Sequence, residues 1–166
     1  MRINLCEIIE MPGKKLPFQC ELETDRLLTP AIKTFLAPPV GSGEIVNTAG
    51  ALTLFGKLSA DAVFICDRCG REYERHMEIP VVSKLAVDES DEDDPETFPL
   101  DGDWLDVSDV LETGFILEAD QKSLCNDDCQ GLCSKCGKNL NDGPCDCKKE
   151  IDPRLAVLEQ LLDKQD

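Results

Sequence analysis

Eight of the ten cysteines in this 166-residue chain occur as closely spaced pairs, the arrangement used by metal-binding thiolates. Two of the pairs have the form C-x-x-C-G, namely Cys66 with Cys69 and Cys133 with Cys136. Two intervening residues let both sulfurs reach one ion, and the following glycine relieves the turn so that backbone N–H groups can approach sulfur. Tetrahedral zinc needs four ligands, so each of these knuckles needs two more.

Two further pairs, Cys125 with Cys129 and Cys145 with Cys147, are the candidates for the missing ligands. The connection from Gly137 to Pro144 contains two Gly, two Asn and one Pro, and can fold back as a tight loop. We therefore expect one four-thiolate centre made of neighbouring residues, formed by Cys133, Cys136, Cys145 and Cys147.

The knuckle at Cys66 and Cys69 then takes Cys125 and Cys129 as its partners. This centre joins positions that are 125 − 69 = 56 residues apart, so it would staple an early part of the chain to a late one. Two alternatives stay open at this point: a single metal site, or an exchange of ligands such as Cys129 with Cys133.

We expect two zinc ions to occupy these centres. Residues 1–7 contain no apolar stretch typical of a secretion signal, so we expect a cytoplasmic protein, where thiols stay reduced and bind metal. An iron–sulfur protein and a zinc-thiolate redox sensor or redox-regulated chaperone remain alternatives, because both also use clustered thiolates. No apolar run approaches the roughly 20 residues needed to cross a bilayer, so we expect no membrane partner.

The other candidate residues do not indicate catalysis. Cys6 and Cys20 stand alone, and we expect them to be small buried apolar residues. His76 is the single histidine, and no Ser/His/Asp set can be built around it. Because no phosphate-binding or dinucleotide-binding motif is present either, we expect no enzyme and no small-molecule substrate.

The scaffold of these ligands is predicted from hydrophobic periodicity. Alternating apolar residues predict a meander of short antiparallel strands over residues 44–87, with Gly56 as a turn or bulge point. A strand over residues 1–9 and a short helix over residues 31–36 precede it. Helical stripes follow at residues 106–119 and 152–164.

Together these elements predict an α+β fold. Its body is an antiparallel β-sheet or partial barrel, and its C-terminal part is a Cys-rich zinc-binding segment that ends in a helix. We divide the chain into a mainly β region (1–87), an acidic loop (88–103) and a region with a helix, the Cys-rich segment and a C-terminal helix (104–166). We expect the last region to pack with the β region as one domain.

The formal net charge of −17 limits the partners. Nine acids and no Lys or Arg fall within residues 88–103, and two four-thiolate zinc centres would bring the total to about −21. Such a chain cannot bind phosphates over its whole surface, and long-range attraction favours basic partners. The candidates for a local basic patch near the metal are Arg68, Arg71, Arg75, Lys135, Lys138, Lys148 and Lys149.

The cysteine-rich half resembles a known family. Its features are Cys66-x2-Cys69 after a β run, the segment 125–141, Cys145-x-Cys147, and Asp152-Pro153-Arg154 before a leucine stripe. These features resemble the YceD family, also called DUF177. The resemblance implies a cytoplasmic bacterial protein or an organellar relative that binds metal and supports accumulation of large-subunit ribosomal RNA. The partner that it implies is large-subunit ribosomal RNA or a basic ribosomal protein.

Overall fold

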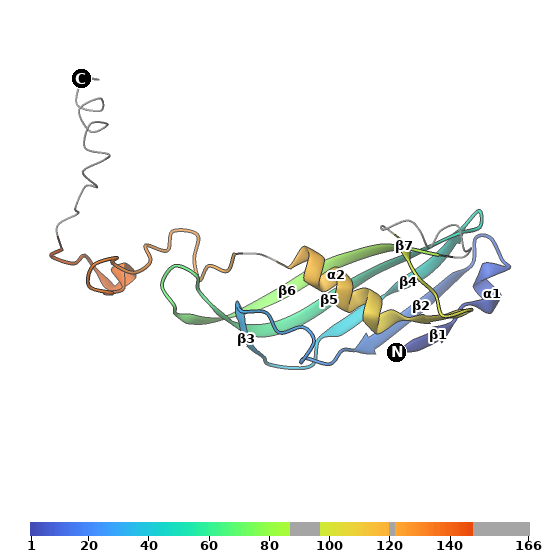
Figure 1. Cartoon of the computed structure of the whole chain (residues 1–166), viewed down its shortest axis with the longest axis horizontal. Coiled ribbons are helices and arrows are strands. Elements are labelled where there is room, and N and C mark those ends of the chain that lie inside the picture. The colour runs from blue at the N-terminus through green and yellow to red at the C-terminus, as the bar shows by residue number, and fades with distance from the viewer. Residues whose placement is uncertain (87–96, 120–121, 148–166) are drawn as a thin grey trace, which may run out of the picture.

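The computed structural model describes residues 1–86, 97–119 and 122–147. A six-stranded sheet has the order β2-β4-β5-β6-β7, with β3 added by pairing to β5, and a two-stranded sheet joins β1 to β8. The body is elongated along the strands, and the Cys-rich segment extends from one end (Figure 1). The strands are β1 (Arg2–Asn4), β2 (Lys15–Glu21), β3 (Ile32–Phe35), β4 (Val40–Thr48), β5 (Ala51–Ile65), β6 (Glu72–Leu85), β7 (Thr97–Phe98) and β8 (Trp104–Asp106). The helices are α1 (Cys6–Ile9), α2 (Val107–Glu118) and the 3-10 helix η1 (Leu140–Asp142).

The predicted meander is antiparallel, but its strands are long rather than short. β5 has 15 residues, β6 has 14, and the two pair without interruption from Leu52↔Leu85 to Ile65↔Glu72. Gly56 is no turn, because it lies inside β5 opposite Gly43 of β4. The glycines serve close packing here: a Cβ on Gly43 would lie 2.6 Å from the Cα of Gly56.

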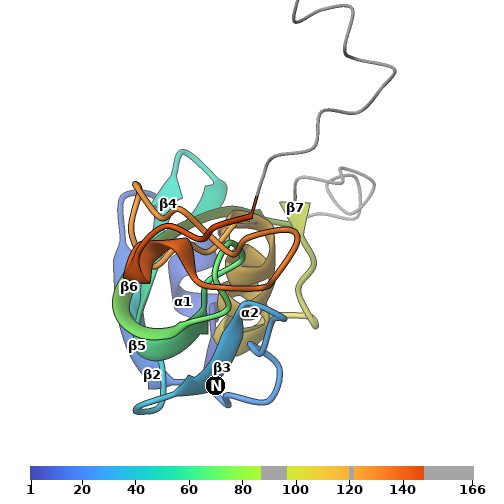
Figure 2. The ribbon, with the colours of Figure 1, turned by 90° about the vertical axis from the view of Figure 1, so that its left-hand side faces the viewer.

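The sheet curls into a half-barrel around α2, which an end-on view shows clearly (Figure 2). One face of each long strand is apolar and points toward the helix, in keeping with the two-residue period of a strand. The helix contributes Val107, Val110, Leu111 and Phe115 to this core, all of them buried. The sheet contributes buried side chains from several strands, among them Phe18, Ile45, Leu54, Leu58, Met77, Ile79 and Val81.

The helix predicted at residues 106–119 is confirmed as α2. Asp106 caps its N-terminus by accepting a hydrogen bond of 3.0 Å from the backbone N–H of Ser108. Gly114, which weakens the helix by its flexibility, faces Val81 of β6. A Cβ at this position would lie 2.5 Å from Cγ1 of Val81, so glycine is what lets α2 approach the sheet.

Two predicted elements near the N-terminus are wrong. Residues 1–9 form the short strand β1 and then the helix α1, instead of one strand. Residues 31–36 hold β3 rather than a helix, since Ile32 and Phe35 pair with Phe64 and Ala62 of β5. Pairing with an existing strand outweighs a weak local helical signal.

The α+β fold class is confirmed by the curled sheet, α2 and the Cys-rich segment. Of the expected acidic loop, residues 88–96 lie outside the described residues, and Thr97–Phe98 form β7, which pairs in parallel with β6. The helix expected at residues 152–164 also lies outside the described residues. Within the described ranges, no helix is long and apolar enough to cross a membrane.

The contact between Gly114 and Val81 generates a prediction. Helix propensity alone predicts that Gly114→Ala stabilises the protein by about 1 kcal/mol. Because the added methyl group collides with a stiff β-branched side chain, we expect instead a loss of about 1–3 kcal/mol in the free energy of unfolding. Urea unfolding measures it. Val81→Ala in the Gly114→Ala background should recover part of the loss, and a more stable single variant would contradict the close packing.

Candidate metal centres

Four cysteine sulfurs meet at the end of the β5–β6 hairpin and form what we call the first centre. Its members are Cys66, Cys69, Cys125 and Cys129, whose sulfurs all lie within 4.8 Å of one another. Cys66 Sγ lies 3.8 Å from Cys129 Sγ, and Cys69 Sγ lies 3.6 Å from Cys125 Sγ. A disulfide needs about 2.05 Å. Tetrahedral zinc with Zn–S bonds of about 2.3 Å places its sulfurs about 3.8 Å apart, so the spacing suits ligands of one ion.

The hairpin itself shapes the first half of this centre. The backbone N–H of Cys66 donates to the carbonyl of Arg71 (2.9 Å), and the N–H of Gly70 donates to the carbonyl of Cys66 (2.8 Å). Gly70 has a φ of +67°, a conformation in which other residues are strained. The paired strands thus end in a tight loop that presents two sulfurs side by side.

The second half arrives with residues 122–132, which dock on the hairpin loop through polar contacts. Asp67 and Ser123 exchange two hydrogen bonds, from Asp67 N to Ser123 O (2.8 Å) and from Ser123 N to Asp67 Oδ2 (2.6 Å). The Tyr73 hydroxyl lies 2.6 Å from Ser123 Oγ. Arg68 donates from its guanidinium to the carbonyl of Cys129 (2.9 Å). These contacts hold the two later ligands against the two earlier ones.

A second centre gathers the remaining four paired cysteines. The sulfurs of Cys133, Cys136, Cys145 and Cys147 also lie within 4.8 Å of one another. Its knuckle repeats the hairpin loop 67 residues later: Cys133 N donates to Lys138 O (2.8 Å), Gly137 N donates to Cys133 O (2.9 Å), and Gly137 has a φ of +71°. The structure therefore brings together the same two sets of four that the sequence spacing favoured.

The two centres differ in their surroundings. In the first, Cys66, Cys69 and Cys129 are buried and form a small core with partly buried Tyr73 and Leu124. In the second, Cys136 is exposed and no buried apolar cluster surrounds the sulfurs within the part of the chain that the structure describes. The first centre thus joins the protein body, whereas the second depends on its ligands for cohesion.

The thiols of the first centre differ in acidity. Burial raises the pKa of Cys66, but backbone N–H groups of Cys125, Cys69 and Arg68 outweigh it and lower that pKa to about 6. Burial and hydrogen bonds to Cys66 and Cys69 raise the pKa of Cys125 to about 12. The Cys66 thiol therefore loses its proton more readily than the Cys125 thiol, and an incoming ion must displace a proton from Cys125.

The second centre shows the same division. Backbone N–H groups of Cys136 and Lys135 lower the pKa of Cys133 to about 6. A hydrogen bond to Cys136, together with burial, raises the pKa of Cys147 to about 12. The pKa of the first cysteine of each knuckle is thus lowered, since the turn aims backbone donors at its sulfur.

The basic residues near the two centres are engaged in internal contacts. Besides the bond from Arg68 to Cys129, Arg71 pairs with Asp142 (2.9 Å) and Lys138 donates to the carbonyl of Pro144 (2.7 Å). These contacts direct the three side chains to partners within the protein, which disfavours an open phosphate-binding surface.

The remaining members of the expected basic patch add little to such a surface. The Arg75 guanidinium lies 5.2 Å from the centre of the Phe64 ring, and neither Arg75 nor Lys135 is free of partners. Lys148 and Lys149 lie outside the described residues.

The unpaired cysteines and the histidine lie outside both centres. Cys6 is exposed on α1, so its expected burial is wrong, whereas Cys20 is half-buried against the core. Burial raises the pKa of Cys20. His76 Nδ1 lies 2.8 Å from Asp61 Oδ1 on the exposed side of the sheet.

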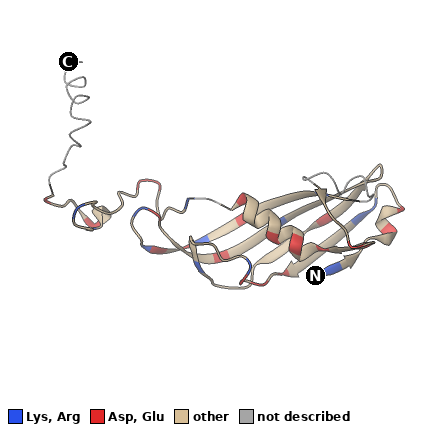
Figure 3. Ribbon diagram, in the orientation of Figure 1, with Lys and Arg blue, Asp and Glu red and all other residues tan. Residues whose placement is uncertain are grey.

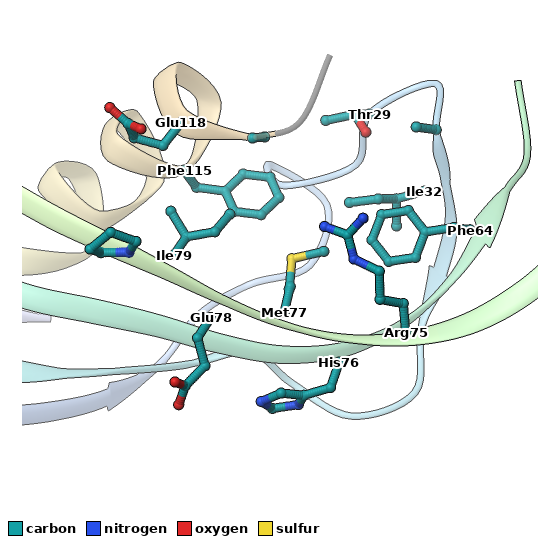
Figure 4. A pocket seen from close by; sticks show the side chains of 13 residues that line it. Thr29, Ile32, Phe64, Arg75, His76, Met77, Glu78, Ile79, Phe115 and Glu118 are labelled. Atoms are coloured by element: carbon teal, nitrogen blue, oxygen red, sulfur yellow. The ribbon is translucent and has the colours of Figure 1, made fainter. Parts of the chain in front are cut away.

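A cavity of about 240 Å³ lies between β6, β3 and the end of α2. Figure 4 shows apolar side chains and Arg75 toward the cavity, with His76 and Glu78 on the other side of the strand. Among the described residues, its lining holds no hydrogen-bonded pair of nucleophile and base, the arrangement that nucleophilic catalysis uses. The thiolate centres are therefore the chemically distinctive sites of the described structure.

Comparison with known proteins identifies the family of this chain. A family described as "Large ribosomal RNA subunit accumulation protein YceD" matches residues 54–162, a range that holds both centres. The chain belongs to the YceD family. The resemblance carried by the cysteine motifs is thereby confirmed.

Individual relatives of this YceD-family chain include uncharacterized proteins of Mycobacterium tuberculosis and Mycobacterium bovis. Each is 31% identical over 124 residues, which cover 72% of this chain and 59% of the relative, so the match spans about three-fifths of their length. The chloroplastic "Large ribosomal RNA subunit accumulation protein YCED homolog 1" of Arabidopsis thaliana is 37% identical over 73 residues, 41% of this chain and 23% of that protein. No solved structure matches the chain.

Several residues of the YceD-family centres escape sequence reasoning. Ser123 and Arg68 act through backbone and side-chain contacts across the chain, and nothing in their local spacing indicates this. Asn141 donates from Nδ2 to Cys129 Sγ at 3.3 Å, although it lies in the loop between two ligands of the other centre. Only the folded arrangement places it there.

Metal content tests both ligand sets. We expect the protein to retain two zinc ions in competition with a chelator, and Cys69→Ser and Cys136→Ser to retain one each, because three thiolates hold the ion more weakly than four. Cys136→Ser should lower the melting temperature of the β body less than Cys69→Ser does, since the second centre shares no core with the body. Cys6→Ser, which removes an exposed cysteine outside both centres, is the matched control and should retain two ions. If Cys136→Ser kept its full zinc content, Cys136 would not be a ligand.

Proposed function

We propose that this protein is a non-enzymatic zinc-binding factor that supports ribosome biogenesis in the cytoplasm, specifically the synthesis or accumulation of large-subunit ribosomal RNA. The observation that carries the proposal is the YceD-family match over residues 54–162, which includes all eight clustered cysteines. The description of the family names RNA accumulation rather than a reaction.

The donor set supports a structural role for the metal. Each centre offers four thiolates, which complete the tetrahedral shell of zinc and leave no position for water or substrate. A [4Fe–4S] cluster would place each thiolate on a different iron and spread the sulfurs farther apart. Sulfurs within 4.8 Å of one another favour a single ion in each centre.

Charge favours a basic ribosomal protein over RNA as the direct partner. Residues 85–121 contain 14 acids and no Lys, Arg or His. The ribbon of α2 in Figure 3 carries acidic positions, coloured red, and no basic position. Arg26 pairs with Asp109 and Glu112 of α2, which leaves Glu118 at the end of the helix. An acidic surface attracts basic proteins and repels phosphates.

The same helix offers apolar anchors for a partner. Ile116 is 63% exposed and Leu117 is 77% exposed, although large apolar side chains usually avoid such exposure when they stand together. Leu117 also lines a groove formed with Val81 and Phe98, which belong to β6 and β7. Apolar anchors within a charged surround are typical of protein–protein interfaces.

Two measurements test this function. Sucrose gradients of cells depleted of the protein should show fewer large subunits relative to small ones, with restoration by the wild-type gene.

Pull-down at low and moderate salt should recover a basic ribosomal protein. Ile116→Ser/Leu117→Ser should weaken that recovery by about tenfold or more, as loss of an apolar anchor does.

Leu36→Ser is the matched control, because Leu36 is an exposed leucine that follows β3 and does not belong to α2. It should leave both the gradient and the pull-down unchanged. An unchanged ribosome profile on depletion would contradict a role in biogenesis and favour the redox-sensor alternative. Recovery of ribosomal RNA without any basic protein would overturn the choice of partner.

A further inference from the structure

Asn141 links the two centres. It lies in η1, within the loop from Cys136 to Cys145, so its position is enclosed by ligands of the second centre. Its Nδ2 nevertheless donates to Cys129 Sγ of the first centre, at 3.3 Å.

The amide of Asn141 is oriented by its neighbours. The backbone N–H of Gln130 donates to Asn141 Oδ1 (2.8 Å), which fixes the oxygen on one side. Asn139 Oδ1 accepts from Asn141 Nδ2 (2.7 Å) and from the Asn141 backbone N–H (3.0 Å). Because the oxygen already has a donor, the nitrogen is the end that faces sulfur.

The loop is also attached to the backbone of the first centre. The N–H of Leu140 donates to the carbonyl of Gly131 (2.9 Å), and the N–H of Leu132 donates to the carbonyl of Arg68 (3.1 Å). A loop closed by metal at its two ends, and held in this way, keeps the Asn141 donor in place. We expect a loop without that closure to be less ordered, and its donor to be less well placed.

We propose that Asn141 is a positioning residue through which metal binding at the second centre strengthens metal binding at the first. The inference rests on the proposed binding of two metal ions. It adds that the metal affinity of one centre depends on whether the other centre is occupied. An N–H donor stabilises the negative charge on a metal-bound thiolate, and such outer contacts tune metal affinity. By linkage, the first centre strengthens the second by the same factor.

A second contact between the same segments, the ion pair from Arg71 to Asp142, supplies a control. Both side chains are more than half exposed, at 52% and 61%, so the pair contributes little. Asp142→Ala therefore disturbs the same loop beside Asn141 without removing the donor to sulfur.

Cadmium-113 NMR with chelator competition measures each centre separately, because each filled centre gives its own resonance. Cys145→Ser/Cys147→Ser, which keeps only the first centre, assigns its resonance and should lower its affinity about tenfold or more. Asn141→Ala in the otherwise intact chain should lower the affinity of the first centre by a similar factor, and shift its resonance.

The double-variant background decides whether the second centre acts through Asn141. Adding Asn141→Ala to Cys145→Ser/Cys147→Ser should change the affinity of the first centre by less than about twofold, and Asp142→Ala alone should do the same. Two bound ions with unchanged affinity in Asn141→Ala would overturn the coupling alone. An equal loss in both backgrounds would also overturn it. A wild-type protein without metal would overturn the metal centres as well.

Discussion

The gathering of four sulfurs at the tip of the β5–β6 hairpin is the constraint on which the C-terminal half depends. Cys69 and Cys125 are 56 residues apart, and closing a loop of that length costs conformational entropy. Few large apolar side chains accompany the later ligands. The compensation comes instead from polar docking on the hairpin loop and from the bonds that four thiolates can make to one ion. The long strands matter because they fix the loop to which everything else attaches.

The sequence predicts the chemistry better than the shape. The knuckles at Cys66 and Cys133 have a local signature, a two-residue spacing followed by glycine, so they are recognisable without a fold. The helix at α2 is predicted because cap and apolar stripe agree. The length of β5 is not predicted, because Gly56 resembles a turn residue when the sequence is taken alone. Its role in close packing depends on Gly43, which lies opposite it in β4. The strand β3 is missed for a related reason, since its partner in β5 is remote in sequence.

The position of Asn141 is a harder case. Its neighbours in sequence belong to one centre and its contact belongs to the other, so periodicity and spacing carry no information about it. The charge of α2 is the opposite case, since composition alone reveals it. The fold adds the location of this charge, because the acidic helix lies on the concave side of the half-barrel. The apolar residues of the helix are divided between the core and the exposed face.

The repeated knuckle has a consequence for how a newly made chain matures. Translation proceeds from the N-terminal side of a chain, so the hairpin that carries Cys66 and Cys69 leaves the ribosome before Cys125 and Cys129. Its sheet can fold at once, because β4, β5 and β6 pair locally along the chain. At that stage Cys66 and Cys69 supply only two of the four sulfurs of the first centre. Complete coordination comes only after Cys125 and Cys129 have emerged, so metal uptake follows the folding of the sheet.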